Sequence, residues 1–278
     1  MHRYPIFKTS ILSRLFGLFA SHPFSLSIQS VINALYVNIT GVLLTDFHPA
    51  NTYPTLNALF TRKLLHPRQF NNDPSVFISP CDSFISASGS IEKESALQIK
   101  GHTYGVSKLL GDYCSLRSKQ KLEGGVYINF YLSPKDYHRY HAPIDMRIVK
   151  AVHIPGKLYP VNFTWLRKIE GLFCENERVV LECYTQENRL FYMVFVGALN
   201  VGKMGFTFDK TIQTNVKSTL QQCYMYRDVH LKKGEELGLF EMGSTIVMFF
   251  EKESFKTQVS HDISIRFGDV LGEVLTHS

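Results

Sequence analysis

The sequence predicts an α+β fold, with N-terminal amphipathic helices followed by a β-rich barrel or sandwich body of mainly antiparallel strands. Three observations predict it. Residues 1–45 contain no Asp or Glu and repeat apolar residues with a helical period. From about residue 76, short β-favouring runs are separated by Gly, Pro and Asn. Strand and helix patterns do not alternate in this second part, which disfavours a doubly wound parallel sheet.

The N-terminal region, residues 1–65, is expected to form two helices. The apolar residues of the first share one face: Phe7, Ile11, Leu12, Leu15, Phe16, Leu18 and Phe19. Pro23 opens the second helix, whose apolar residues also repeat with helical period: Phe24, Ile28, Val31, Ile32 and Leu35. Such helices either pack on the protein core or lie in a membrane interface, with their cations near anionic headgroups. Packing on the core is the commoner role of an amphipathic helix; the acid-free, Phe- and Leu-rich composition points toward the interfacial anchor but does not decide between the two.

The second region, residues 66–278, is expected to be a β-rich domain. Its strand-like runs are 76–79, 126–131, 178–182, 190–196 and 244–250. With 278 residues, 45% hydrophobic and 19% charged, the chain can bury a sizeable core and is not expected to be disordered.

Charge and cysteine content restrict the possible partners. The net charge of +6 suits an anionic partner, either nucleic acid or an acidic lipid surface, but the basic residues are scattered. The five cysteines form no Cys-x-x-Cys pair, which argues against a zinc knuckle or a disulfide framework and favours free thiols in a reducing compartment. No segment reaches the ~18 uninterrupted apolar residues of a membrane-spanning helix.

A reactive serine is suggested by Glu241-Met242-Gly243-Ser244-Thr245. Gly243 has no Cβ, so its carbonyl is open to attack. The Ser244 hydroxyl is tethered to that carbonyl and can shift the acyl group from nitrogen to oxygen once a base removes its proton. A Gly-Ser-Thr triplet also occurs in ordinary turns, so the motif indicates a reactive serine only together with a catalytic base and an acid that orients it.

Candidate partners lie upstream. His138 and His141 stand three apart in a loop bounded by prolines, where they can be a metal pair, a base and an acid, or surface residues; no matching third ligand is evident, and a histidine base is the better chemical fit. Asp82, in Ser79-Pro80-Cys81-Asp82-Ser83, is either part of an Asx-turn or the carboxylate that orients a histidine. Together these residues supply nucleophile, base and orienting acid.

These motifs resemble those of the phosphatidylserine decarboxylase family. The run 234–245 is similar to the family's processing site, and 136–143 is similar to its Asp-Tyr-His-Arg-x-His element. Supporting similarities are found at 57–64, 100–104, 172–178 and 196–202. The chain departs from the family pattern at Ser83, where glycine is usual, and at Met242, where leucine is common.

The resemblance implies a self-cleaving proenzyme. Asp82 would orient His141, which would take the proton of Ser244, and cleavage between Gly243 and Ser244 would give a β chain 1–243 and an α chain 244–278. Ser244 would become a covalent pyruvoyl cofactor that forms a Schiff base with phosphatidylserine and accepts the electrons released with CO2, giving phosphatidylethanolamine. His138 would protonate the resulting carbanion and Tyr137 would shape the substrate pocket. Neither a metal nor pyridoxal phosphate is expected.

The same resemblance implies the partners and the location. We expect a heterodimer of the β and α chains, with a homodimer of these also possible, acting on phosphatidylserine in an anionic membrane and not on nucleic acid. Because no Arg- and Ser-rich presequence precedes the helices, we expect peripheral attachment to the cytoplasmic face of a bacterial inner membrane. Two alternatives stay open: a pyruvoyl-dependent decarboxylase of a soluble amino acid, and a non-catalytic lipid-binding relative.

Overall fold

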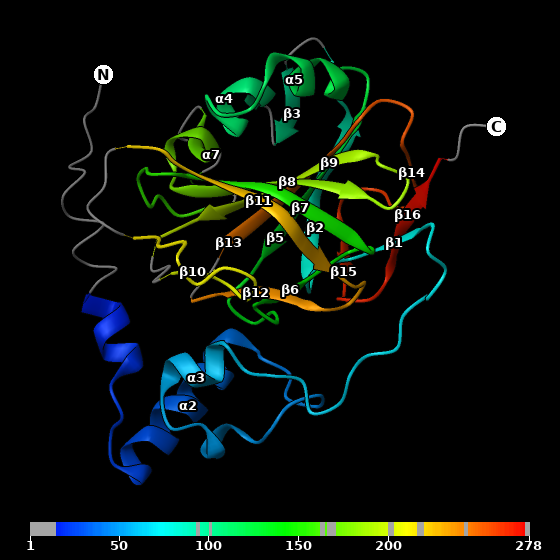
Figure 1. Ribbon diagram of the computed structural model, residues 1–278. Coiled ribbons are helices and arrows are strands. Elements are labelled where there is room, and N and C mark those ends of the chain that lie inside the picture. The colour runs from blue at the N-terminus through cyan, green and yellow to red at the C-terminus, as the bar shows by residue number, and fades with distance from the viewer. Residues whose placement is uncertain are drawn as a thin grey trace.

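The computed structural model describes residues 15–92, 95–99, 102–161, 165, 171–199, 203–215, 220–241 and 244–275 (Figure 1). For residues 95–99, 102–103 and 244 it describes the backbone alone. The first half of the expected first helix, with Phe7, Ile11 and Leu12, lies outside the described residues. The N-terminal helices lie beside a body of β-sheets in Figure 1, as the sequence predicts.

The N-terminal region contains a short helix, Leu15–Ser21, and helix α2 (Leu26–Thr40), followed by a 3-10 turn η1 (Ala50–Thr52) and helix α3 (Leu56–Phe60). Helix α2 ends at Gly41, whose φ of 72° is favourable for glycine, and the Gly41 backbone N–H donates to the Val37 carbonyl. Among the described residues no single helix is long and apolar enough to cross a membrane. The first helix and α2 pass that test only as a pair, and they are bent by 120°.

The two buried residues of helix α2 are polar and many of its apolar residues are exposed, although Ile32, Tyr36 and Val37 pack partly buried against a small apolar cluster. Gln29 and Asn33 are only 3% and 0% exposed, and Asn33 Nδ2 donates to the carbonyls of Ala50 (2.8 Å) and Tyr53 (3.0 Å). The apolar side chains that are more than half exposed are Leu26, Ile28, Val31, Leu35 and Ile39. This is the reverse of the pattern of a helix that packs on a protein core.

The body is built around an eight-stranded sheet in which all neighbouring strands are antiparallel. In order across the sheet, its strands are β11 (Gln222–Leu231), β7 (Met146–Ile154), β8 (Arg178–Thr185), β9 (Leu190–Gly197), β13 (Ser244–Phe250), β5 (Val126–Leu132), β2 (Ser83–Ser90) and β15 (Ile263–Ile265). Strand β13 therefore lies inside the sheet, between β9 and β5.

Smaller sheets and short helices complete the body. The remaining strands pair as β10 (Met204–Phe206), β12 (Glu236–Phe240) and β6 (Arg139–His141); as β1 (Val76–Ile78), β16 (Val270–Val274) and β14 (Phe255–Thr257); and as β3 (Ser95–Ile99) with β4 (His102–Gly105). Helices α4 (Val106–Leu110), α5 (Leu116–Leu122) and α7 (Leu172–Glu175) lie over one face of the large sheet (Figure 1).

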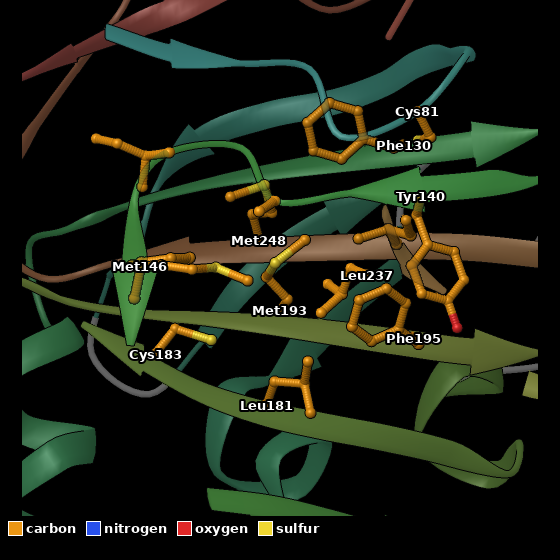
Figure 2. Packing of buried hydrophobic residues seen from close by; sticks show 14 of the residues in the cluster. Cys81, Phe130, Tyr140, Met146, Leu181, Cys183, Met193, Phe195, Leu237 and Met248 are labelled. Atoms are coloured by element: carbon orange, nitrogen blue, oxygen red, sulfur yellow. The ribbon is translucent and has the colours of Figure 1, made fainter. Parts of the chain in front are cut away.

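Both faces of the large sheet are buried at its centre. On β13, Ile246 and Met248 face one core and Val247 and Phe249 face the other, following the two-residue period of a strand. Figure 2 shows the first core, where Phe195 of the large sheet lies beside Tyr140 of β6 and Leu237 of β12. The second core is covered by helices α4, α5 and α7.

The expected strands are confirmed, because the five predicted runs correspond to β1, β5, β8, β9 and β13. The barrel alternative is not found: β11 and β15 end the large sheet without pairing with each other in the described part of the chain, so the sheets are open. The three short helices between β4 and β8 were not expected, since each has fewer than eight residues and too little sequence for a helical period to be visible.

Candidate active site

Two chain connections join the large sheet to the β10-β12-β6 sheet, and their described ends are paired. One leads from β5 to β6 and carries His138; the other leads from β12 to β13 and contains the Gly243–Ser244 junction. At one end, the Ser244 backbone pairs with Leu132. At the other end, the Phe240 backbone N–H donates to the His138 carbonyl (2.9 Å). Gly243 and the side chain of Ser244 lie outside the described residues; the register places the described ends of the two connections next to each other.

The junction is also held from the β9 side. Gly197, the last residue of β9, pairs with Ser244. The buried Asn176 donates from Nδ2 to the Gly197 carbonyl (2.8 Å) and to the Tyr159 carbonyl (2.9 Å), and it accepts from the Tyr159 backbone N–H (3.0 Å). Asn176 thus connects three backbone groups and fixes the strand end opposite Ser244.

His141 lies in β6 with both ring nitrogens occupied. Its Nδ1–H donates to the Gly234 carbonyl (2.9 Å), so its Nε2 accepts from the Tyr137 hydroxyl (3.0 Å). The ring of Phe267 stacks on the imidazole at 3.7 Å between centroids and 12° between planes. Burial lowers the pKa of His141 to about 4, against the opposing effect of the Gly234 carbonyl. A neutral imidazole with a basic Nε2 is the form that a general base needs.

Asp82 lies in the turn between β1 and β2, and its carboxylate is strongly bound. The Arg68 guanidinium binds both carboxylate oxygens, and the Phe267 backbone N–H donates to Oδ1 (2.8 Å). Asp46 binds Arg68 from the other side (3.2 Å). None of these hydrogen bonds reaches His141, so the direct Asp82–His141 contact of the expected relay is absent from this arrangement. The two residues are instead connected through Phe267, whose backbone binds Asp82 and whose ring stacks on His141.

His138 is completely buried and has one nitrogen in use. Its Nδ1–H donates to the Asp136 carbonyl (2.9 Å), and the Phe60 ring lies 3.9 Å away between centroids. Its Nε2 has no hydrogen-bond partner in the described part of the chain. Burial, followed by the charge of Arg62, lowers the pKa of His138 to about 3. The ring is therefore neutral near pH 7, with an unused lone pair on Nε2.

The Thr245 hydroxyl, next to Ser244 in the chain, is also buried, with no hydrogen-bond partner among the described residues. Unsatisfied buried polar groups are rare in folded proteins and often mark a functional site. His138 Nε2 and the Thr245 hydroxyl are therefore each available to bind a further polar group.

A pocket of about 510 Å³ opens beside this cluster. Asp82, Tyr137 and Arg68 line it, as does Leu43, which follows helix α2 and is 77% exposed. The pocket therefore connects the N-terminal helices with the loop that carries the histidines. Tyr137 borders the pocket with its body while its hydroxyl binds His141; its role in substrate binding stays a prediction.

Several site residues were not singled out from the sequence. Arg62 lies in the family-like run 57–64 and so carried a signal, but Arg68 and Phe267 belong to no motif. The stacking of Phe267 on His141 joins residues 126 positions apart (267 minus 141), and no local pattern predicts such a pair.

Comparison with known proteins gives a consistent result. The sequence model described as phosphatidylserine decarboxylase matches residues 56–273. The phosphatidylserine decarboxylase proenzyme of a Helicobacter pylori strain is 47% identical over 266 residues, covering 95% of this chain and 97% of the relative. The Campylobacter jejuni proenzyme is 45% identical over 266 residues (94% and 97%), and the Coxiella burnetii proenzyme is 34% identical over 259 residues (92% and 90%). The chain therefore belongs to the phosphatidylserine decarboxylase family of carboxy-lyases.

Proposed function

We propose that this chain is a proenzyme that cleaves itself between Gly243 and Ser244 and then decarboxylates phosphatidylserine to phosphatidylethanolamine. The observation that carries the proposal is the register that aligns the Gly243–Ser244 junction with the His138 loop. The proenzyme relatives, which share the length and much of the sequence of this chain, support it.

In the cleavage reaction, Ser244 Oγ attacks the Gly243 carbonyl carbon after His141 takes the hydroxyl proton on Nε2. The peptide C–N bond breaks as the ester C–O bond forms, and the freed nitrogen takes up the proton held by His141. Elimination then removes the Ser244 Cα proton and breaks the Cβ–O bond, which releases the Gly243 carboxylate and leaves dehydroalanine at the start of the α chain. Water replaces the nitrogen, which leaves as ammonia, and the product is the pyruvoyl group.

Two residues around His141 prepare it for this step. The Gly234 carbonyl fixes the tautomer with the proton on Nδ1, and Phe267 holds the plane of the ring. Asp82 acts through Phe267, because its carboxylate binds the Phe267 backbone. The Tyr137 hydroxyl occupies the Nε2 lone pair in this structure, so it has to rotate away or pass the serine proton on to Nε2.

In the decarboxylation reaction, the pyruvoyl group would supply the carbonyl that binds the substrate amine and the electron sink for the loss of CO2. His138 is proposed to deliver a proton from Nε2 to the carbon that loses CO2. Because its pKa is held near 3, the His138 ring is neutral at rest and has to acquire that proton during turnover. For the same reason the protonated ring is a strong acid and gives the proton up readily. The burial of His138 also excludes water from this position.

Membrane attachment is proposed to occur through α2. Its exposed apolar face would enter the acyl boundary of the bilayer, while Asn33, which accepts a hydrogen bond from Gln29, binds the Ala50 carbonyl on the protein side. The pocket begins at Gly41 and Leu43, directly after this helix, so a lipid headgroup would reach the site from the membrane side. We propose peripheral attachment at the cytoplasmic face of a bacterial inner membrane, in keeping with the bacterial relatives.

Intact mass spectrometry tests the proposal. The purified wild-type protein is expected to give two chains, with an α chain whose mass matches residues 244–278 carrying pyruvoyl in place of serine. Ser244→Ala is expected to give one full-length chain, whereas Ser90→Ala, at an exposed serine in the same large sheet, cleaves normally. Decarboxylation is then measured on phosphatidylserine in mixed micelles and on free serine. One uncleaved wild-type chain, or activity on free serine alone, would refute the proposal.

A further inference from the structure

Arg62 is a buried cation without a carboxylate partner. It follows helix α3, is 2% exposed, and donates only to backbone carbonyls: from Nη2 to Lys135 (2.8 Å) and Asp136 (3.0 Å), and from Nη1 to Leu59 (3.4 Å). Its Nε has no hydrogen-bond partner among the described residues. Burying a charge is costly unless it is compensated, and burial accordingly lowers the pKa of Arg62. The guanidinium lies over the Phe47 ring, with Cζ 4.6 Å from the centroid, so carbonyl dipoles and an aromatic ring compensate the charge in place of a carboxylate.

The Asp136 carbonyl receives two donors. One is Arg62 Nη2 and the other is His138 Nδ1–H, at 3.0 and 2.9 Å. By holding this carbonyl in place, Arg62 holds the acceptor that decides which His138 nitrogen carries the proton. Phe60, from the last turn of α3, packs on the same imidazole. The end of α3 thus supports His138 from two directions.

We infer that Arg62 is a positioning residue for His138: it fixes the Asp136 carbonyl that selects the tautomer with a free Nε2, and it places a positive charge beside the ring. The inference rests on the proposed function for its catalytic meaning, since His138 is the proposed proton donor. Its structural part, the dependence of the His138 tautomer on Arg62, is independent of catalysis.

The charged groups around His138 are few. Arg62 faces it from the α3 side, and Asp136 and Lys135 belong to its own loop. The Asp136 carboxylate turns back to accept from the Ser133 backbone and hydroxyl (both 2.7 Å), and the neighbouring Arg139 binds Glu236 and the Thr61 carbonyl. Arg62 is the charged side chain that lowers the pKa of His138, after burial.

A matched control is available within the chain. Arg178 is also buried and also donates only to backbone carbonyls, those of Leu109, Lys108, Cys174 and Asn176, on the face of the sheet covered by α4 and α7. It has the same structural role as Arg62 but contacts neither histidine of the site. If replacing either arginine changes His138 in the same way, the cause is a general loosening of the fold. If only replacement of Arg62 changes His138, the cause is loss of positioning.

The first experiment is nitrogen NMR of histidine-labelled, full-length Ser244→Ala protein, which reports tautomer and titration without any need for activity. With Arg62 intact, His138 is expected to carry its proton on Nδ1. Arg62→Met is expected to give a mixture of tautomers and to raise the pKa of His138 by about one pH unit, the size expected for loss of one nearby charge. Arg62→Lys keeps the charge, so it is expected to keep the pKa of His138 low but to give a mixture of its tautomers. This variant also serves as the test if Arg62→Met does not fold. Arg178→Lys is expected to change neither.

The second experiment is decarboxylation by the cleaved enzyme in mixed micelles. Arg62→Met is expected to lower kcat about tenfold or more with little change in KM, and to move the acid limb of the kcat profile to higher pH, because an interaction that serves the chemical step is lost. An unchanged His138 tautomer and titration in Arg62→Met, or an equal change in Arg178→Lys, would overturn the inference. Absence of decarboxylation in every cleaved variant and in the wild type would refute the proposed function while leaving the NMR result valid.

Discussion

Acidification is expected to destabilise the folded protein through its two buried site histidines. The folded-state pKa is about 3 for His138 and about 4 for His141, both lowered mainly by burial from the ordinary value of 6.5. As the pH falls through 6.5, the unfolded chain takes up a proton at each histidine but the folded protein does not. The two histidines therefore leave the free energy of unfolding almost unaffected above that pH, and they lower it progressively as the pH falls toward their folded-state pKa values.

The magnitude follows from the difference in proton uptake. At about pH 5 the unfolded state is favoured by RT ln(1 + 10^1.5), which is about 2 kcal/mol for each histidine. The result depends little on the folded-state pKa, provided that this lies well below 5, as both values do. The two histidines together are expected to lower the free energy of unfolding by about 4 kcal/mol between about pH 7 and about pH 5. This is a large part of the stability of an ordinary domain.

Urea unfolding of Ser244→Ala protein measures this effect, because the uncleaved chain unfolds without dissociation. His138→Gln and His141→Gln are each expected to reduce the loss of unfolding free energy between the two pH values by about 2 kcal/mol. His261→Gln, whose side chain is 61% exposed, is the control and is expected to leave that loss unchanged. If both site variants lose as much stability on acidification as their parent, the two histidines are not held neutral by burial and the reasoning is wrong.

Two further predictions concern the membrane face and the junction. Replacing Val31 and Ile39 on the exposed face of α2 by Glu is expected to reduce co-sedimentation with vesicles containing phosphatidylserine at least tenfold, whereas Met225→Glu, at a residue of similar exposure on β11, is not; equal loss in both would refute the role of α2. Asn176→Ala is expected to lower stability by roughly 2–3 kcal/mol and to slow self-cleavage on denaturing gels about tenfold, because the strand end opposite Ser244 is released. Asn33→Ala removes an equally buried, equally bonded amide from the N-terminal region and is expected to leave cleavage unchanged.

The sequence predicts those parts of the molecule that local patterns determine. The run 244–250 became a strand with the predicted ends, because β-favouring apolar residues fill both of its buried faces. The sequence does not predict that Asp82 binds Arg68 and not His141, because this depends on how segments that are far apart in the sequence pack together. The burial pattern of α2 could not be predicted, because a helical period of apolar residues does not show which side of the helix faces the protein. The structure buries Gln29 and Asn33, and Asn33 donates to the Ala50 carbonyl.

The place of Ser244 in the sheet bears on whether the two products of the proposed cleavage would stay together. Ser244 is the first residue of β13, which pairs along its whole length with β9 and β5, and β15 and β16 pair with β2 and β1. Every described strand of the proposed α chain except β14 thus has a partner in the proposed β chain. The same pairing aligns Ser244 with Leu132, at the end of the strand that leads to His138, so the proposed site is complete only when strands from both sides of the junction are in register. Under the proposed mechanism, cleavage therefore follows folding, and the folded sheet would also hold the two products together.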